Sequence, residues 1–324
     1  MSRSSSPAAE AVGVAVSLSG LTRRFGTLTA VDGLTFDVAT GELFGIVGPD
    51  GAGKTTTLRM LAGVLPPSDG TALVEGVDVG VEPEAAKPRL AYMAQRFGLY
   101  GDLTVQENLD FYADLYRVPK VDRPERLDRL YRFSRLDEFK GRLAGKLSGG
   151  MKQKLALSCC LTHHPRVLLL DEPTFGVDPI SRRDLWLILH EMVGEGITVV
   201  VSTSYLDEAE RCDRVVLLDQ GRPLAMDRPQ ALQRSLRGTM VSLQVERPRE
   251  ARDILKGMPG VESATLFGET VHMLIEEGVD QATPLQALAD AGLAVRESEE
   301  MAPSLEDVFI HLVTAPDQGA ASHA

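Results

Sequence analysis

The sequence comprises 324 residues, with 34 Lys and Arg against 46 Asp and Glu, which gives a formal net charge of −12. This acidic balance argues against a nucleic-acid partner, because phosphate backbones repel an acidic surface and no basic stripe offsets the excess. Hydrophobic residues make up 44% of the chain and charged residues 25%, which is typical of a folded globular protein. The longest apolar runs are of strand length, well below the roughly 20 residues that a bilayer-spanning helix needs. We therefore expect any membrane role to be exerted through a partner.

The chain from residue 14 onward alternates strand-like and helix-like segments. Apolar runs separated by Gly and Asp turns favour strands at residues 14–18, 34–38, 43–47, 167–170, 198–202 and 215–218. Apolar side chains at helical spacing favour helices at residues 55–65, 181–193 and 207–211. The alternation predicts an α/β fold with a mostly parallel sheet.

Two further regions differ from this core. Residues 103–161 are rich in Leu, Arg, Asp and Glu with apolar residues three and four apart, which predicts a helical insertion. Within it, the Arg-rich run from Arg123 to Arg142 is interleaved with acids and is interpreted as a solvated helix face. After Gly238, short strand-like runs alternate with two helical ones. We divide the chain into a disordered tail (1–13), the α/β domain (14–238), a small α+β domain (239–315) and a second tail (316–324).

Cysteine and histidine usage gives no indication of a structural metal or a disulfide framework. Cys159, Cys160 and Cys212 have neither paired spacing nor an even number, and we interpret them as reduced, buried thiols. His163 and His164 are adjacent but have no third ligand nearby in the sequence. We do not interpret them as a metal site.

A glycine-rich loop carries the first functional signal. The segment GPDGAGKTT fits the phosphate-binding pattern G-x-x-x-x-G-K-[ST] and lies between a predicted strand and a predicted helix. Gly51 and Gly53 allow successive backbone N–H groups to point at phosphate oxygens, helped by the positive end of the following helix. Lys54 is expected to reach the β- and γ-phosphates, and the Thr55 hydroxyl to ligate Mg²⁺. The predicted nucleotide-binding residues of this loop are Gly48, Pro49, Asp50, Gly51, Ala52, Gly53, Lys54, Thr55 and Thr56.

Two later segments indicate a family. LSGGMKQK (Leu147–Lys154) and VLLLDEPTFGVDP (Val167–Pro179) resemble the signature and Walker B segments of ABC transporter ATPases, in the family's order and spacing. In this pattern an apolar strand ends in Asp171, which can hold Mg²⁺ through water, and the adjacent Glu172 can polarise the attacking water. The resemblance implies a P-loop ABC ATPase fold, with an antiparallel β subdomain beside the parallel sheet and the helical insertion.

The resemblance also implies roles for residues outside these carboxylates. Ser148, Gly149 and Gly150 open a helix and correspond to the clamp that grips the γ-phosphate bound to the opposite subunit. Phe25 resembles the aromatic residue that stacks on adenine, and Asp178 matches the D-loop aspartate. Gln95, in the run YMAQR, resembles the glutamine that senses Mg²⁺ and the permease, so it joins both the predicted catalytic residues and the predicted metal ligands Thr55 and Asp171.

The sequence departs from the family pattern at two positions. Ser204 stands where most members have a histidine that contacts the γ-phosphate and the attacking water. Its shorter, uncharged side chain is expected to leave the γ-phosphate unbridged to Glu172 and so to slow hydrolysis. Asp50 stands where Asn is commoner and adds a negative charge near the phosphates. The hypothesis is that this chain is the weaker half of a heterodimer; the alternative is that Ser204 is tolerated and the chain works as an active homodimer.

Three more segments resemble the ATP-binding subunits of bacterial drug-type (ABC-2 class) exporters: residues 96–116, 178–186 and 303–312, the last marking an accessory C-terminal domain. The resemblance implies an ATPase that uses Mg-ATP, pairs with a second ATP-binding chain and drives a separate integral-membrane permease. Such a chain would be cytoplasmic and peripheral on the inner face of the plasma membrane. The alternative function is a soluble ABC ATPase without a permease. The cargo is not encoded in this chain.

Overall fold

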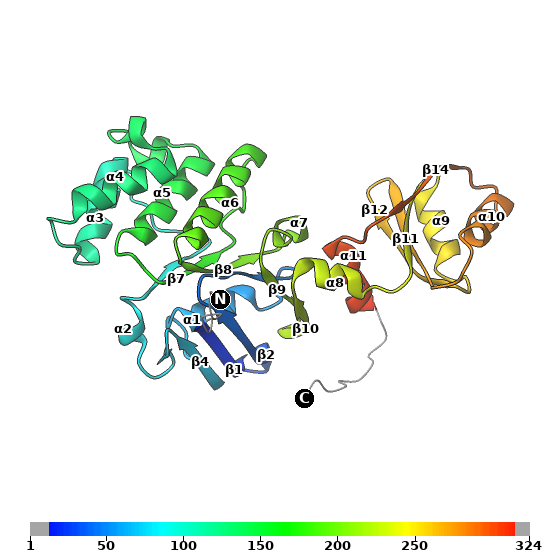
Figure 1. Ribbon diagram of the computed structural model, residues 1–324, viewed down its shortest axis with the longest axis horizontal. Helices are drawn as coiled ribbons and strands as arrows, with labels where there is room; N and C mark the ends of the chain where they lie inside the picture. Colours follow the sequence, from blue (N-terminus) through cyan, green and yellow to red (C-terminus); the bar gives the residue numbers. More distant parts are fainter. Residues whose placement is uncertain (1–12, 315–324) are drawn as a thin grey trace, which may run out of the picture. The chain divides into compact units, whose positions relative to one another are not determined.

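A computed structural model describes residues 13–314, shown in Figure 1. The predicted tails at 1–13 and 316–324 lie outside these residues, except for Gly13. The described chain divides into two compact units. One contains the residues up to 205 together with 211–223, and the other contains 206–210 together with the residues from 224 on. The limits proposed from the sequence at residues 14–238, 239–315 and 103–161 stay predictions.

The centre of the first unit is a six-stranded sheet. Its strand order is β10 (Arg222–Asp227), β9 (Arg214–Asp219), β3 (Leu43–Val47), β8 (Thr198–Thr203), β7 (Val167–Asp171) and β6 (Leu90–Met93). β3 pairs in parallel with β8 and β9, and β7 pairs in parallel with β6 and β8. Every residue of β3, β7 and β8 is buried, which explains why these strands are apolar runs rather than alternating ones. The predicted α/β fold with a mostly parallel sheet is confirmed.

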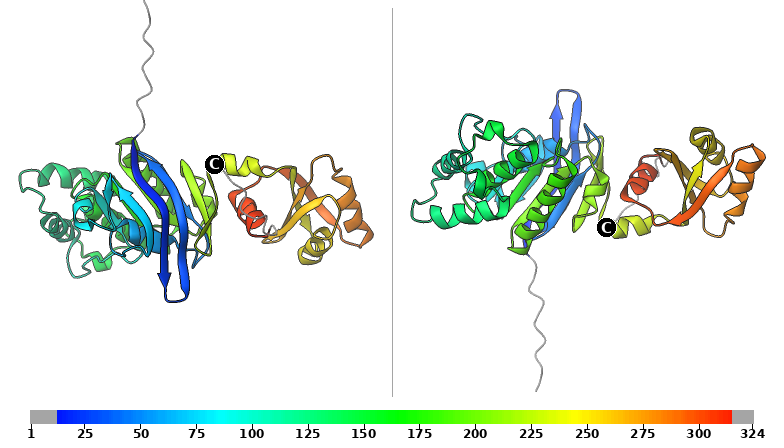
Figure 2. Two further views of the ribbon diagram at one scale, coloured as in Figure 1. Left: turned by 90° about the horizontal axis from the view of Figure 1, so that it is seen from below. Right: turned by 90° about the horizontal axis from the view of Figure 1, so that it is seen from above.

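A second, antiparallel sheet lies beside it, in the order β2 (Leu28–Ala39), β1 (Val14–Phe25), β4 (Asp69–Val74), β5 (Val77–Asp78). The strands predicted at 14–18 and 34–38 are the outer parts of β1 and β2, which form the long hairpin coloured blue in Figure 2. Phe25 pairs with Leu28 at the turn of this hairpin, and Gly26 between them has a φ of 58°. Phe25 is 45% exposed there.

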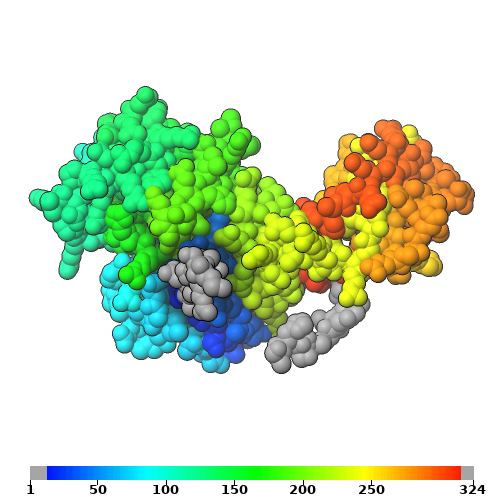
Figure 3. All heavy atoms as spheres, in the orientation of Figure 1, coloured from blue at the N-terminus to red at the C-terminus, as the bar shows by residue number. Residues whose placement is uncertain are grey.

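The helices of the first unit are α1 (Lys54–Leu61), α2 (Pro83–Ala86), α3 (Val105–Leu115), α4 (Arg123–Ser134), α5 (Gly149–Leu161) and α6 (Pro179–Gly194), with short 3-10 turns at Asp137–Phe139 and Ala144–Lys146. α3 and α4 both pack on α5, and this helical region forms the teal and green surface in Figure 3. The predicted helix 55–65 ends four residues early, at Leu61. Gly63 follows in the left-handed region at φ 66°, the usual way a helix terminates.

The second unit has its own antiparallel sheet, in the order β12 (Val261–Phe267), β13 (Thr270–Ile275), β11 (Thr239–Val245), β14 (Val295–Met301). α9 (Pro248–Leu255) and α10 (Ala282–Asp290) supply Leu255 and Leu288 to the apolar core of this sheet. α7 (Leu206–Ala209), α8 (Pro229–Ser235) and α11 (Leu305–Thr314) also belong to this unit, and α11 packs on α7 and α8.

Candidate nucleotide-binding site

The glycine-rich loop joins the buried end of β3 to the start of α1. A Cβ atom on Gly48 would lie 2.2 Å from the backbone oxygen of Leu218, and one on Gly53 would lie 2.6 Å from that of Ala30. Gly53 also has a φ of 100°, which L side chains rarely adopt. The fold therefore requires glycine at both positions, and the loop curves tightly around the first residue of α1, Lys54.

Replacing Gly48 with Ala is expected to destabilise the first unit by about 1–3 kcal/mol, because neither the Leu218 carbonyl nor the loop can move aside without distortion. The thermal unfolding midpoint should fall by several degrees. Gly141→Ala is a matched control, since a Cβ at Gly141 meets nothing within 4 Å and its φ is not positive. Equal midpoints for the two variants would contradict this reading of the loop.

The ammonium group of Lys54 is buried and points into the loop. Its Nζ donates to the backbone oxygens of Gly48, at 2.7 Å, and Pro49, at 3.0 Å. It also lies 3.1 Å from Glu172 Oε1 and 3.1 Å from Ser204 Oγ. A cation is thus held at the centre of the loop, facing the carboxylate of Glu172, the residue directly after β7.

Asp171 ends β7 and is 1% exposed. Its Oδ1 accepts hydrogen bonds from Thr55 Oγ1 and from Ser202 Oγ, both at 2.9 Å, and its Oδ2 accepts one from the Tyr92 hydroxyl at 3.3 Å. Burial, followed by the charge of Asp171, raises the pKa of Tyr92 to about 12, so the phenol stays protonated and donates to Asp171. The Thr55 hydroxyl and the Asp171 carboxylate are oxygen donors of the type that suits Mg²⁺.

Glu172 follows directly and adopts a left-handed backbone conformation with φ 46°. Its N–H donates to Ser202 Oγ at 3.0 Å, so one hydroxyl contacts both acidic residues. The Glu172 carboxylate accepts from Ser204 Oγ at 2.7 Å and from Gln95 Nε2 at 3.3 Å. Glu172 therefore meets side chains from three separate segments of the chain.

Several of these groups line one cavity of about 330 Å³ in the first unit, whereas Gly48, Pro49, Asp171 and Ser204 are not among its lining residues. Its walls include most of the glycine-rich loop together with Gln95, Glu172 and Phe25 at the turn of the β1–β2 hairpin. The predicted residues that line it are Phe25, Asp50, Gly51, Ala52, Gly53, Lys54, Thr55, Thr56, Gln95 and Glu172. The Arg23 guanidinium lies 4.7 Å from the centre of the Phe25 ring. The glycines, the cation and the oxygen donors together fit a phosphorylated ligand with a bound divalent ion.

The signature residues are not among those that line this cavity. Ser148 caps α5, its Oγ accepting from the N–H of Met151 at 3.3 Å. A Cβ on Gly150 would lie 2.2 Å from Ser181 Oγ, whereas Gly149 is exposed. Asp178 caps α6 by accepting from the N–H of Ser181 at 2.9 Å, and this hydrogen bond lowers the pKa of Asp178. Ser148, Gly149 and Gly150 thus form a separate group at the start of α5.

Sequence reasoning did not identify Tyr92 and Ser202 as parts of the site. Both are remote from Asp171 in sequence and become its neighbours because β6 and β8 flank β7. A signal was present for Ser202, which is a buried hydroxyl directly after the apolar run of three valines in β8. Parallel pairing places such a residue beside the carboxylate that ends the next strand.

Comparison with known proteins agrees with this geometry. A model of the ABC transporter family matches residues 31–175, and a model of the C-terminal domain of DrrA1-3-like ATP-binding proteins matches residues 228–313. The chain is 45% identical over 304 residues to the probable multidrug ABC transporter ATP-binding protein YbhF of Escherichia coli K12, covering 92% of this chain and 52% of that protein. The chain thus spans about half the length of that relative.

Other relatives match over nearly their full length. The chain is 35% identical over 301 residues to the Nod factor export ATP-binding protein I of Rhizobium sp. strain N33, covering 92% of this chain and 97% of that protein. A solved structure of an ATP-binding subunit of an ABC transporter superposes with a TM-score of 0.62 at 30% identity, covering 68% of this chain and 92% of that one. In residues 13–314 no helix has both the length and the apolar character needed to cross a bilayer. The comparisons confirm the resemblance seen in the sequence: the chain belongs to the ABC transporter family of ATP-binding proteins.

Proposed function

We propose that this chain binds and hydrolyses Mg-ATP to power an exporter whose permease is a separate polypeptide. The observation that carries the proposal is that Lys54, Thr55 and Glu172 line the glycine-rich cavity and that Thr55 is hydrogen-bonded to Asp171. A cation, two oxygen donors for a divalent ion and a carboxylate base are the parts that phosphoryl transfer to water requires.

Each residue has a distinct task in this mechanism. Mg-ATP, when bound, supplies the phosphoryl group and the divalent charge that neutralises it. The backbone N–H groups of the loop and Lys54 bind phosphate oxygens, while Thr55 and Asp171 hold Mg²⁺. When phosphate binds, Lys54 leaves its ion pair with Glu172 and contacts phosphate oxygens instead. The Glu172 carboxylate can then accept a proton from the attacking water. Gln95 Nε2 donates to Glu172 and orients its carboxylate.

A second ATP-binding chain completes the site in this proposal. Ser148, Gly149 and Gly150 stand apart from the cavity of their own chain, and a serine beside the backbone amides of a helix start is suited to an anion. Pairing two chains would bring the signature of one to the phosphates bound by the other. Hydrolysis then reopens the pair.

The contacts of Ser204 bear on whether that second chain is identical. The sequence suggested that serine would leave the γ-phosphate unbridged to Glu172, and the weaker half of a heterodimer was the resulting hypothesis. Ser204 Oγ nevertheless lies 2.7 Å from Glu172 Oε1 and 3.1 Å from Lys54 Nζ. These contacts support the alternative, in which the serine orients Glu172 and two copies form an active pair.

Steady-state ATPase assays on Ser204 variants distinguish the two proposals. In an active homodimer, Ser204→Ala should lower kcat by about tenfold or more, because a hydrogen bond to a charged group is lost, with little change in KM. Ser204→Thr, which keeps the hydroxyl, should retain most activity, and Ser204→His should not raise it. In the heterodimer hypothesis, the wild-type chain alone is nearly inactive and Ser204→His raises its turnover.

The permease is proposed to dock in a groove of about 300 Å³ formed by the segment around Gln95 and the first half of α5. Its lining includes Phe97, Leu99, Gly145 and Ala156, which offer an apolar floor for a helix from the partner. Gln95 lines both this groove and the nucleotide cavity, so docking has a direct route to Glu172. This arrangement would hold the chain at the cytoplasmic face of the plasma membrane.

Purification of the tagged chain from a detergent extract tests this assignment. A polytopic membrane protein is expected to co-purify with it, because the permease is proposed to bind in the docking groove. Recovery with ribosomes or DNA, and without a membrane protein, would favour the alternative of an ABC ATPase that has no permease. Drug-type efflux is the cargo class we propose, on the basis of the multidrug and Nod factor export relatives.

A further inference from the structure

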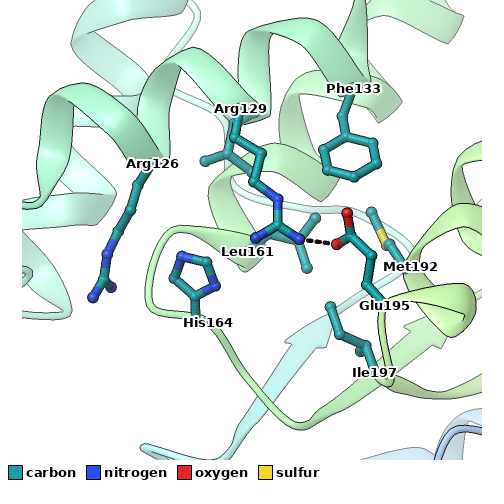
Figure 4. Close-up of a pocket in the computed structure, with 9 residues that line it drawn as sticks. Arg126, Arg129, Phe133, Leu161, His164, Met192, Glu195 and Ile197 are labelled. Carbon is teal, nitrogen blue, oxygen red and sulfur yellow. Dashed lines mark hydrogen bonds and ion pairs between the residues drawn. The ribbon is translucent and has the colours of Figure 1, made fainter.

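A second pocket in the first unit is remote from the loop residues. It lies between α4, the end of α5 with the turn that follows it, and the segment from the end of α6 to the start of β8 (Figure 4). Its apolar wall consists of Leu130, Phe133, Leu161, Met192 and Ile197. Met192 and Leu161 are buried, whereas Phe133 is only partly covered. The pocket therefore has an apolar interior with access from solvent.

The polar part of the pocket is cationic and contains one acid. Figure 4 shows the Arg129 guanidinium reaching Glu195 across the pocket, and the two form an ion pair. Arg126 lies on the other side of His164 and is held by Asp122 at 3.2 Å. Burial, followed by the charges of Arg126 and Arg129, lowers the pKa of His164. Glu195 is thus the acid that neutralises this cationic wall from within the pocket.

The Arg129–Glu195 ion pair lines two cavities, an inner pocket and an outer groove. The inner pocket holds about 20 Å³, which is room for one water molecule. An outer groove of about 330 Å³ shares Arg129, Phe133 and Glu195 with it and is also lined by Arg132 and Glu191. Separation of Arg129 from Glu195 would join the two into a site within the usual size range for small organic ligands, roughly 300–1,000 Å³. Both partners are partly exposed, at 39% and 36%, so the pair is not locked by burial.

We propose that this pocket binds an amphipathic monoanion, that is, a small organic molecule with an aromatic or aliphatic body and one carboxylate, sulfonate or phosphate ester group. The anionic group replaces the Glu195 carboxylate at Arg129, which a planar guanidinium accepts with two parallel hydrogen bonds. The apolar body covers Phe133, Met192 and Ile197. A cationic ligand would be repelled by the charges of Arg126 and Arg129. A neutral ligand would form no charge-assisted hydrogen bond with Arg129.

A ligand in this pocket would contact two parts of the first unit, the helical region and the segment that leads into β8. α4 belongs to the helical segment that packs on α5, whereas Glu195 and Ile197 lead into β8, which carries Ser202 next to Asp171 and is followed by Ser204. A molecule seated here contacts both parts at once. This site is independent of the proposed ATPase function.

A matched pair of fluorescent probes tests the proposal on the full chain. 1-Anilinonaphthalene-8-sulfonate carries one sulfonate on an apolar aromatic body, and N-phenyl-1-naphthylamine is the same body without the charge. The wild-type chain is expected to bind one equivalent of the sulfonate at least about tenfold more tightly than the neutral probe, since one charge-assisted contact is gained. The sulfonate should bind equally with saturating Mg-ADP present; displacement by Mg-ADP would place it in the loop cavity and overturn the proposal.

Charge variants complete the test. Arg129→Gln is expected to remove the preference for the sulfonate while leaving the neutral probe bound, which also shows that the pocket has kept its fold. Glu195→Gln is expected to strengthen sulfonate binding, because Arg129 loses its competing acid. Arg123→Gln is the control: it breaks an ion pair with Asp114, 2.7 Å away on the same surface, without touching the pocket. Equal binding of the two probes, no binding, or sulfonate affinity unchanged by Arg129→Gln would overturn the assignment.

Discussion

Replacement of Glu172 with Gln is expected to reduce the rate of phosphate release from Mg-ATP by about 10²- to 10⁴-fold, the usual contribution of a general base. The amide keeps the size of the side chain, and its oxygen can still accept from Ser204 Oγ. Its NH₂ group cannot accept from Gln95 Nε2 or take the proton of the attacking water. Lys54 stays in place through the Gly48 and Pro49 carbonyls, so Mg-ATP should still bind. The measurement is single-turnover hydrolysis alongside nucleotide binding by calorimetry.

The control for this prediction is Glu138→Gln, which neutralises an exposed carboxylate in the helical region and should leave the rate unchanged. Retention of more than about a tenth of wild-type turnover in Glu172→Gln would exclude Glu172 as the base. Loss of nucleotide binding in the same variant would instead indicate that the Glu172 carboxylate maintains the conformation of the glycine-rich loop through Lys54.

Replacement of Lys54 with Ala is expected to weaken Mg-ATP binding by about 100-fold or more. The Lys54 Nζ is the cation at the centre of the loop, and two charge-assisted hydrogen bonds to phosphate contribute about 3–6 kcal/mol together. The side chain is 4% exposed, so the change also leaves Glu172 without its ion-pair partner. Repulsion between that carboxylate and the triphosphate adds to the loss. Isothermal titration with a non-hydrolysable ATP analogue measures the effect.

Lys87→Ala serves as the matched control for Lys54, because Lys87 forms an ion pair with Glu84 on the surface and lines no part of the cavity. Its affinity for the analogue should equal that of the wild-type chain. If Lys54→Ala bound the analogue within about threefold of wild type, the phosphate would have to sit elsewhere and the proposed function would fail.

The features that the sequence predicted well are local ones. β3 has the predicted bounds, and the loop, Lys54 and the Asp171–Glu172 pair follow from short patterns whose geometry is set by one strand and one helix. The family and the α/β fold were inferred from the same patterns and are confirmed by the comparisons. Strand β14 was not predicted, because its sequence, VRESEEM, is almost wholly exposed and has no apolar run.

The features that the sequence did not predict depend on long-range pairing. Tyr92 and Ser202 reach Asp171 from strands that are 79 and 31 positions away in sequence. The contact of Ser204 with Glu172 likewise depends on where β8 ends relative to β7. The residue type suggested only that serine would leave the γ-phosphate unbridged to Glu172. Its contact with the carboxylate itself, at 2.7 Å, depends on the backbone path and was not predicted.

The hydroxyl of Ser202 accepts from the N–H of Glu172 and donates to the Oδ1 of Asp171. One hydroxyl on the adjacent strand therefore ties the carboxylate of Asp171 to the backbone of Glu172. These hydrogen bonds hold the Asp171 carboxylate in place. An ion of a different radius would therefore have to be accommodated by the triphosphate and its water shell.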